Sequence, residues 1–169
     1  LSFGTLNFIN KEFMPAQDQS TYIVRMQTPI DSSMEFTDAK TREAEAFLAS
    51  RPEVRRYMVA VGGFGTGGQS NLTNIFVSMK AKGERGVDPE AGHELSQQEL
   101  MAVTREALKK LGLKVSIQDM SQRGFTASRG FPVELAVQGR DWDKLVAYSE
   151  TIIEKLDATG LVTDTDSDY

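Results

Sequence analysis

Three glycines, Gly63, Gly65 and Gly68, have the GxGxxG spacing with which dinucleotide-binding turns bring the backbone close to a pyrophosphate. That chemistry needs a helix directly after the loop, because the helix N-terminus holds the phosphates. Here residues 74–80 follow, and their apolar side chains recur at every second position, which predicts a strand. The spacing therefore does not predict a nucleotide site.

The same glycines belong to a ten-residue loop, residues 62–71, that joins two predicted strands and carries one aromatic side chain, Phe64. A tight hairpin needs only about two residues. Glycine keeps left-handed backbone angles accessible, so five glycines among ten residues predict a mobile loop. A long loop of this composition is more typical of a functional segment than of a simple connection.

Residues suited to metal or nucleophilic chemistry are scarce. The chain has no cysteine and a single histidine, His93, which excludes thiol catalysis and any multi-histidine metal site. Asp164, Asp166 and Asp168 imitate the start of a calcium loop, but the glycine and the closing glutamate of such a loop are missing. We therefore expect no metal, no cofactor and no catalytic residue, that is, a protein that is not an enzyme.

Length and charge narrow the class further. The 169 residues suffice for one ordinary domain or two small ones. A net charge of −5 argues against nucleic acid as a partner. No window approaches the roughly 18 consecutive apolar residues of a membrane span. The apolar start, residues 1–9, is too short for a span and lacks the basic beginning of a signal peptide.

The first predicted strand covers residues 20–28 and has two different faces. One face is apolar, and the other is mixed. The apolar face contains Tyr22, Val24 and Met26, and the mixed face contains Ile23, Arg25 and Gln27. A helix is expected next, with Ser32 and Glu35 as a capping box, Phe36, Ala39, Ala46 and Phe47 as its core stripe, and Pro52 as its stop.

The remaining signals complete a β-α-β-β-α-β order. Strands are predicted on both sides of the glycine loop, a solvated connection over residues 81–94, a helix over 96–111 with a Ser96–Glu99 capping box, and a strand over 113–118. This is the split βαβ or ferredoxin-like order. Its two helices cover one face of the sheet and leave the mixed face available.

A second βαβ pattern begins after this unit. Residues 131–138 alternate like a strand, and Asp141 is placed to cap a helix whose apolar stripe begins at Trp142 and ends at Leu156. We expect Trp142 to pack within that helix stripe. Gly160 ends the helix, and residues 161–164 begin another extended segment. The fold class predicted is α+β, a ferredoxin-like subdomain followed by a partial βαβ subdomain.

Four segments carry a resemblance to a known family: KEFMPAQDQ at 11–19, AVGGFG at 60–65, IFVSMK at 75–80 and SQRGFT at 121–126. They resemble the RND (resistance-nodulation-division) multidrug efflux pumps of the acriflavine-resistance B type, which export hydrophobic and amphiphilic molecules. The likeness extends over about residues 8–169, with the order and spacing of the parts retained. The run EFMPAQDQS before a β-α-β-β-α-β pattern is its most specific part.

The resemblance implies a particular organisation. Residues 1–17 would lead from a missing membrane helix, 18–121 would form the first C-terminal porter subdomain, 122–130 a linker, and 131–169 part of the second such subdomain. The chain would then be a periplasmic piece of a bacterial inner-membrane antiporter driven by protons. The full pump of this family is a homotrimer that docks with a periplasmic adaptor protein and an outer-membrane channel. Its substrates are amphiphilic small molecules.

The resemblance also implies site residues. The glycine loop resembles the switch loop of the family, with Gly62, Gly63, Gly65, Gly67, Gly68 and Asn71 as its matching positions. The substrate path would contain Ile23, Arg25, Gln27, Phe64, Phe76, Phe131, Val133 and Leu135. Two positions depart from the family pattern: Thr66 stands where relatives often have a second loop aromatic, and Arg25 stands where they often have methionine. Arg25 favours a more polar or anionic ligand.

Other interpretations of the same residues remain. The mixed face at Ile23, Arg25 and Gln27 is also what a solvated strand face looks like. A free-standing ferredoxin-like sensor of small molecules would use the same open sheet face. An acylphosphatase-like hydrolase shares the element order, but residues 29–32 make a poor, acidic candidate for its phosphate loop, and fold order alone does not carry function.

Overall fold

A computed structural model describes residues 18–62, 69–120, 133–165 and 167. Their elements, in chain order, are β1 (Thr21–Gln27), α1 (Met34–Ser50), β2 (Val54–Val61), β3 (Leu72–Met79), α2 (Gln97–Lys109), β4 (Lys114–Asp119) and α3 (Trp142–Ala158). No helix in these ranges is long and apolar enough to cross a bilayer.

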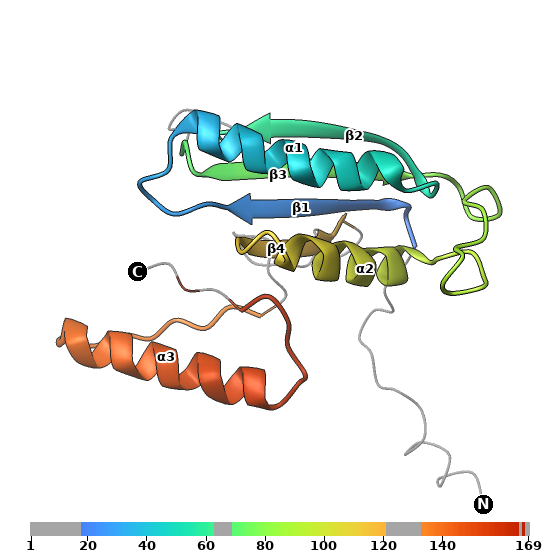
Figure 1. The fold of residues 1–169 in the computed structure, drawn as a ribbon. Helices are drawn as coiled ribbons and strands as arrows, with labels where there is room; N and C mark the ends of the chain where they lie inside the picture. Colours follow the sequence, from blue (N-terminus) through green and yellow to red (C-terminus); the bar gives the residue numbers. More distant parts are fainter. Residues whose placement is uncertain (1–17, 63–68, 121–132, 166, 168–169) are drawn as a thin grey trace, which may run out of the picture.

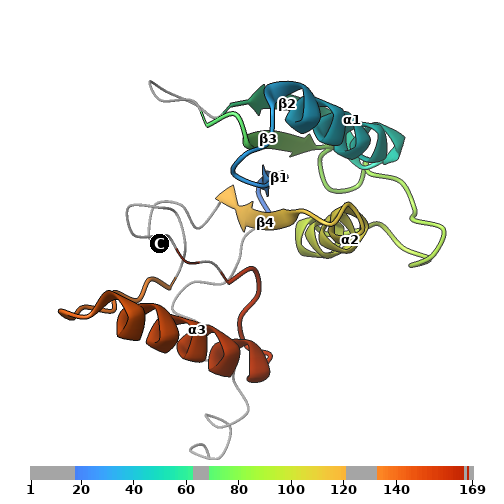
Figure 2. The same ribbon diagram turned by 60° about the vertical axis from the view of Figure 1, so that its left-hand side comes forward.

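The four strands form one antiparallel sheet in the order β2-β3-β1-β4. Both α1 and α2 lie against the same face of this sheet, and the views in Figures 1 and 2 show the opposite face without a helix of its own unit. Strand order and helix placement are those of a ferredoxin-like fold, so the predicted α+β class is confirmed.

The core lies between the sheet and these two helices, and period-two alternation selects its strand residues. The predicted apolar face of β1 is buried, and so is the apolar face of β3. The cluster joins Tyr22, Val24, Met26, Ile75, Val77, Met79, Leu100 and Leu108, among others. Tyr22 keeps its polar end satisfied inside this core, because its hydroxyl lies 3.1 Å from the Thr104 hydroxyl.

The start and the buried stripe of α1 differ from the prediction. Ser33 is the N-cap, and its Oγ accepts the Phe36 N–H at 3.2 Å; Glu35 is then one position short of a capping box. Phe36 is 46% exposed, and the stripe predicted from it is wrong apart from the half-buried Phe47. The buried positions are Thr37, Thr41, Ala44 and Leu48.

Threonines replace the expected apolar residues because their hydroxyls are paired inside the fold. The Thr41 Oγ1 donates to the Thr37 carbonyl at 2.7 Å and lies 2.9 Å from Thr73 Oγ1 on β3. The Thr37 Oγ1 lies 2.9 Å from Thr28 Oγ1, just after β1. A buried hydroxyl with a partner costs little, so α1 is fixed on the sheet by hydrogen bonds as well as by apolar contacts.

The predicted Ser96–Glu99 capping box of α2 is confirmed, with both reciprocal hydrogen bonds present. The connection before it is largely the solvated segment expected from its composition, since residues 81–94 are exposed apart from the buried Arg85 and Asp88 and the half-buried Glu94. Arg85 is 1% exposed, and it forms a salt bridge of 2.7 Å with Asp18. Polarity alone does not predict the two buried positions, because Arg85 and Asp88 are buried through their ion pairs with Asp18 and Arg51.

The second βαβ pattern is only partly realised. Asp141 caps α3 as predicted, accepting the Lys144 N–H at 3.3 Å. Residues 133–138 form no strand, and a strand without a neighbour has no ladder to stabilise it. No residue of α3 is buried, and Trp142 is 63% exposed, so its predicted packing in the helix stripe is wrong. Both ribbon views show α3 apart from the helix-covered sheet (Figures 1 and 2).

Candidate functional site

The face of the sheet opposite α1 and α2, here called the open face, is assembled by the strand register. Ile23 on β1 lies between Phe76 of β3 and Gln118 of β4. Two residues along, Arg25 lies between Asn74 and Ser116. At the end of β1, Gln27 lies between Leu72 and Lys114. The predicted positions Ile23, Arg25, Gln27 and Phe76 therefore share one surface.

One part of the open face is apolar. Ile23 is only 5% exposed although no helix of the sheet covers it, and Phe76 beside it is half-buried. Met58 on β2, opposite Phe76, is 55% exposed. These three side chains form a continuous apolar row across β1, β3 and β2. Met58 is not among the predicted site residues, although strand alternation places it on this face, between the inward-facing Tyr57 and Val59.

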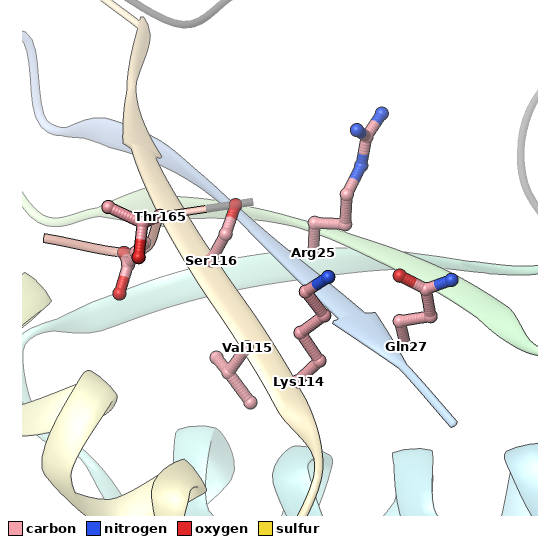
Figure 3. A pocket seen from close by; sticks show the side chains of 7 residues that line it. Arg25, Gln27, Lys114, Val115, Ser116 and Thr165 are labelled. Carbon is pink, nitrogen blue, oxygen red and sulfur yellow. The ribbon is translucent and has the colours of Figure 1, made fainter. Parts of the chain in front are cut away.

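Arg25 supplies a cation next to this row. Its side chain is exposed, and its Nε donates to Asn74 Oδ1 at a long 3.4 Å. Figure 3 shows the guanidinium extending away from the sheet, on the same side as Gln27, Lys114 and Ser116. The open face thus has an apolar side chain, Ile23, and a cationic one, Arg25, at neighbouring outward positions of β1.

A small cleft lies beside Arg25, between β1, β4 and the segment after α3 (Figure 3). Its volume is about 30 Å³, and its lining consists of Arg25, Gln27, Lys114, Val115, Ser116, Asp164 and Thr165. Within the described part of the chain, the buried Ser116 Oγ has no hydrogen-bond partner. Lys114 and Ser116 are not among the predicted site residues, although the alternation of residues 113–118 places both on the open face.

Asp164 closes one side of this cleft and is held firmly. Its carboxylate accepts from Arg105 Nε at 2.9 Å and from Arg105 Nη2 at 2.9 Å. The same carboxylate accepts the Ile117 backbone N–H at 3.0 Å, on the edge of β4 that does not face β1. Asp164 adopts a positive φ of 60° at this contact. It is therefore a docking residue on the sheet edge.

The glycine loop is described only at its two ends. Gly62 has φ +87° and donates its N–H to the Leu72 carbonyl at 2.7 Å. Asn71 is buried, its side-chain amide donates to the Thr28 carbonyl at 3.1 Å, and its own carbonyl accepts the Thr28 N–H at 2.9 Å. Both ends are thus tied to the fold. Phe64, Gly63, Gly65, Gly67 and Gly68 lie outside the described residues.

The predicted cleft strand of the second unit is not brought to this site. Phe131 lies outside the described residues. Val133 is 62% exposed and Leu135 is 64% exposed, and neither lines the cleft. From the second unit, Asp164 and Thr165 line it instead, and no sequence pattern predicts them as open-face residues.

Comparison with known proteins places the whole chain in one family. The profile of the AcrB/AcrD/AcrF family matches residues 1–169. A search of the curated proteins finds no match. Members of the matched family are inner-membrane efflux transporters of the RND type and not enzymes. The match covers every residue of the chain, including the ferredoxin-like unit described above. The chain therefore belongs to the AcrB/AcrD/AcrF family.

Proposed function

We propose that this chain is a periplasmic porter region of a proton-driven RND efflux transporter, and that the open face forms part of its substrate entrance cleft and drug path. One observation carries the proposal: both helices lie on one face of the sheet, and the other face presents apolar and cationic side chains together. Binding surfaces for amphiphiles need this combination of apolar area and a few placed polar groups.

The substrate path in this proposal contains Ile23, Arg25, Gln27 and Phe76 on the open face, with Phe64, Phe131, Val133 and Leu135 completing it in the assembled transporter. The assignment of Phe64 and Phe131 to the substrate path rests on the family resemblance alone. The exposure of Val133 and Leu135 is compatible with a lining role, since neither side chain is committed to a core.

The assembly is proposed on the same basis. A homotrimer in the inner membrane would dock with a periplasmic adaptor protein and an outer-membrane channel, and residues 62–71 would act as the switch loop. The anchors at Gly62 and Asn71 support that role, because a segment that changes conformation needs fixed ends.

The proposal is tested by dye accumulation in cells that carry the complete transporter at matched abundance. Phe76→Ala removes an aromatic side chain from the open face and is expected to reduce efflux of amphiphilic dyes several-fold. Phe36→Ala is the matched control, because Phe36 is exposed on α1, on the other side of the sheet. Unchanged efflux in Phe76→Ala, or equal losses in both variants, contradicts a substrate path over the open face. A free-standing sensor would bind the dyes and leave efflux unaffected.

A further inference from the structure

The cleft between β1 and β4 contains a buried hydroxyl that nothing in the described chain satisfies. The Ser116 Oγ has no hydrogen-bond partner there, although it lines the cleft next to Arg25. Buried polar atoms almost always have a partner, and each exception calls for an explanation such as a missing ligand. A hydroxyl can donate its proton to an oxygen atom placed in the cleft.

The charge around this hydroxyl is positive. Arg25 uses Nε for Asn74, and no described residue accepts from its two terminal nitrogens. Lys114 adds a second basic side chain to the lining. The one carboxylate in the lining, Asp164, is already neutralised by its hydrogen bonds with the Arg105 guanidinium and by the Ile117 N–H. The guanidinium fork is suited to two oxygens of one anionic group.

The size and position of the cleft define what fits. About 30 Å³ corresponds to roughly one water-sized group, so a head-group oxygen fits and a ring does not. Ile23 lies on the same face of β1 as Arg25, two residues or about 7 Å along the strand from it. Ile23 itself is only 5% exposed, so an alkyl tail attached to that head group would run over the accessible part of the apolar row, Phe76 and Met58.

We propose that this cleft is a subsite for the anionic head group of an amphiphile, a carboxylate, sulfate or phosphate, whose tail lies along the apolar row. Arg25 provides the charge, Ser116 donates a hydrogen bond, and Thr165 closes the site from the segment after α3. The proposal deepens the proposed function and rests on it, since it takes the open face to be the surface that meets substrate. The net charge of −5 opposes general attraction of anions, so an anion preference has to arise locally.

The test compares two probes with the same tail and opposite head groups, octyl sulfate and octyltrimethylammonium. Both are titrated calorimetrically into the 169-residue chain below their critical micelle concentrations. Octyl sulfate is expected to bind about tenfold more tightly than the ammonium probe. Arg25→Gln should abolish this preference, and Ser116→Ala should weaken octyl sulfate alone by a few-fold.

Arg56→Gln is the matched control. Arg56 is a residue of β2 and lies opposite Ser78 of β3, on the same open face but two strands away from Arg25. The substitution removes the same positive charge. It should leave the sulfate preference intact, and circular dichroism verifies that each variant folds. Equal losses in Arg56→Gln and Arg25→Gln overturn the subsite, because the attraction is then general.

The remaining outcomes separate this inference from the proposed function. If both probes bind equally well and Phe76→Ala weakens both, the anion subsite is overturned, but the open face is supported as a substrate surface. Binding of neither probe overturns the subsite and also counts against the proposed function.

Discussion

At the scale of single residues, Arg85 connects more of the fold than any composition argument suggests. Its Nε donates to the Lys80 carbonyl, its Nη1 to Asp18 and the Leu95 carbonyl, and its Nη2 to Asp18 and the Ser20 hydroxyl. These are all five N–H donors of a guanidinium. They join the start of β1, the end of β3 and the segment leading into α2. Asp18, within the EFMPAQDQS run, thus has a structural role.

Arg85→Met is expected to lower the free energy of unfolding by about 3 kcal/mol, because it leaves a carboxylate and two carbonyls without their partner. Urea denaturation measures this loss. Arg42→Met is the control: Arg42 also pairs with an aspartate, Asp38, at 2.9 Å, but both side chains are exposed. An exposed pair contributes little, so the control should unfold like the original chain. Similar stabilities for both variants would contradict the role assigned to Arg85.

The ion pair between Asp18 and Arg85 should make the free energy of unfolding depend on pH. The Arg85 hydrogen bond lowers the pKa of Asp18 from 3.8 to about 2, with further contributions from the Gln97 and Ser20 N–H groups. A folded pKa below the unfolded one stabilises the fold above pH 4, and this stabilisation is lost as the pH falls toward 2. Asp18 lies at an exposed position where water screens its charge, so the pKa difference corresponds to about 1 kcal/mol of stability.

The measurement compares the original chain with Asp18→Asn, because other carboxylates also titrate in this range. Their difference in free energy of unfolding should shrink by about 1 kcal/mol between pH 5 and pH 2. A difference that stays constant over this range would show that the carboxylate charge of Asp18 does not stabilise the fold.

At the scale of elements, the sequence predicted the strands better than the first helix. Alternation in β1 and β3 identified their buried faces because apolar side chains occupy every inward position except Thr73. In α1 the inward positions Thr37 and Thr41 are polar, and their pairing with Thr28 and Thr73 depends on tertiary contacts. A pattern based on hydrophobicity alone therefore selects the wrong stripe.

The candidate site, like the fold, was only partly predictable from the sequence. The mixed side of β1 indicated Arg25, and the alternation of residues 113–118 contained Ser116. The contribution of Asp164 was not predictable, because it depends on a segment about 50 residues away docking at the edge of β4. Sequence periodicity describes faces of elements and not contacts between distant segments.

The Asp164 contact gives a prediction at this scale. Asp164→Ala should remove the acceptor of the Ile117 N–H and speed hydrogen exchange of that amide at least tenfold, because the outer edge of β4 then opens to water. Two-dimensional NMR measures this rate residue by residue. Glu154→Ala, an exposed charge removal on α3, is the control and should leave the rate unchanged. Unchanged protection in Asp164→Ala would mean that the segment after α3 does not dock through this carboxylate.

At the scale of the whole molecule, the two parts of the chain differ in how much surface they bury. The ferredoxin-like unit has a continuous core between its sheet and two helices. Helix α3 has no buried residue, and its large side chains Trp142 and Tyr148 are 63% and 60% exposed. Val133 and Leu135 before it are exposed as well. Surface of this kind, gathered on one segment, is typical of a site that contacts another surface.

We therefore expect the chain to bind a neutral hydrophobic dye, Nile red, through the region of α3. A neutral dye is needed because an anionic one would also report on the cleft beside Arg25. Replacing Trp142 and Tyr148 together by glutamine should reduce the fluorescence gain by more than half, since these two side chains supply most of the exposed aromatic area of the helix. Phe36→Gln, on the exposed side of α1, removes a comparable aromatic side chain from the other unit and should change the signal little. Light scattering in parallel measures self-association, which the double variant should also weaken. A monomeric chain with a quenched, solvent-protected Trp142 and no dye binding would contradict the exposed state of α3 and, with it, the idea that this helix awaits a partner surface.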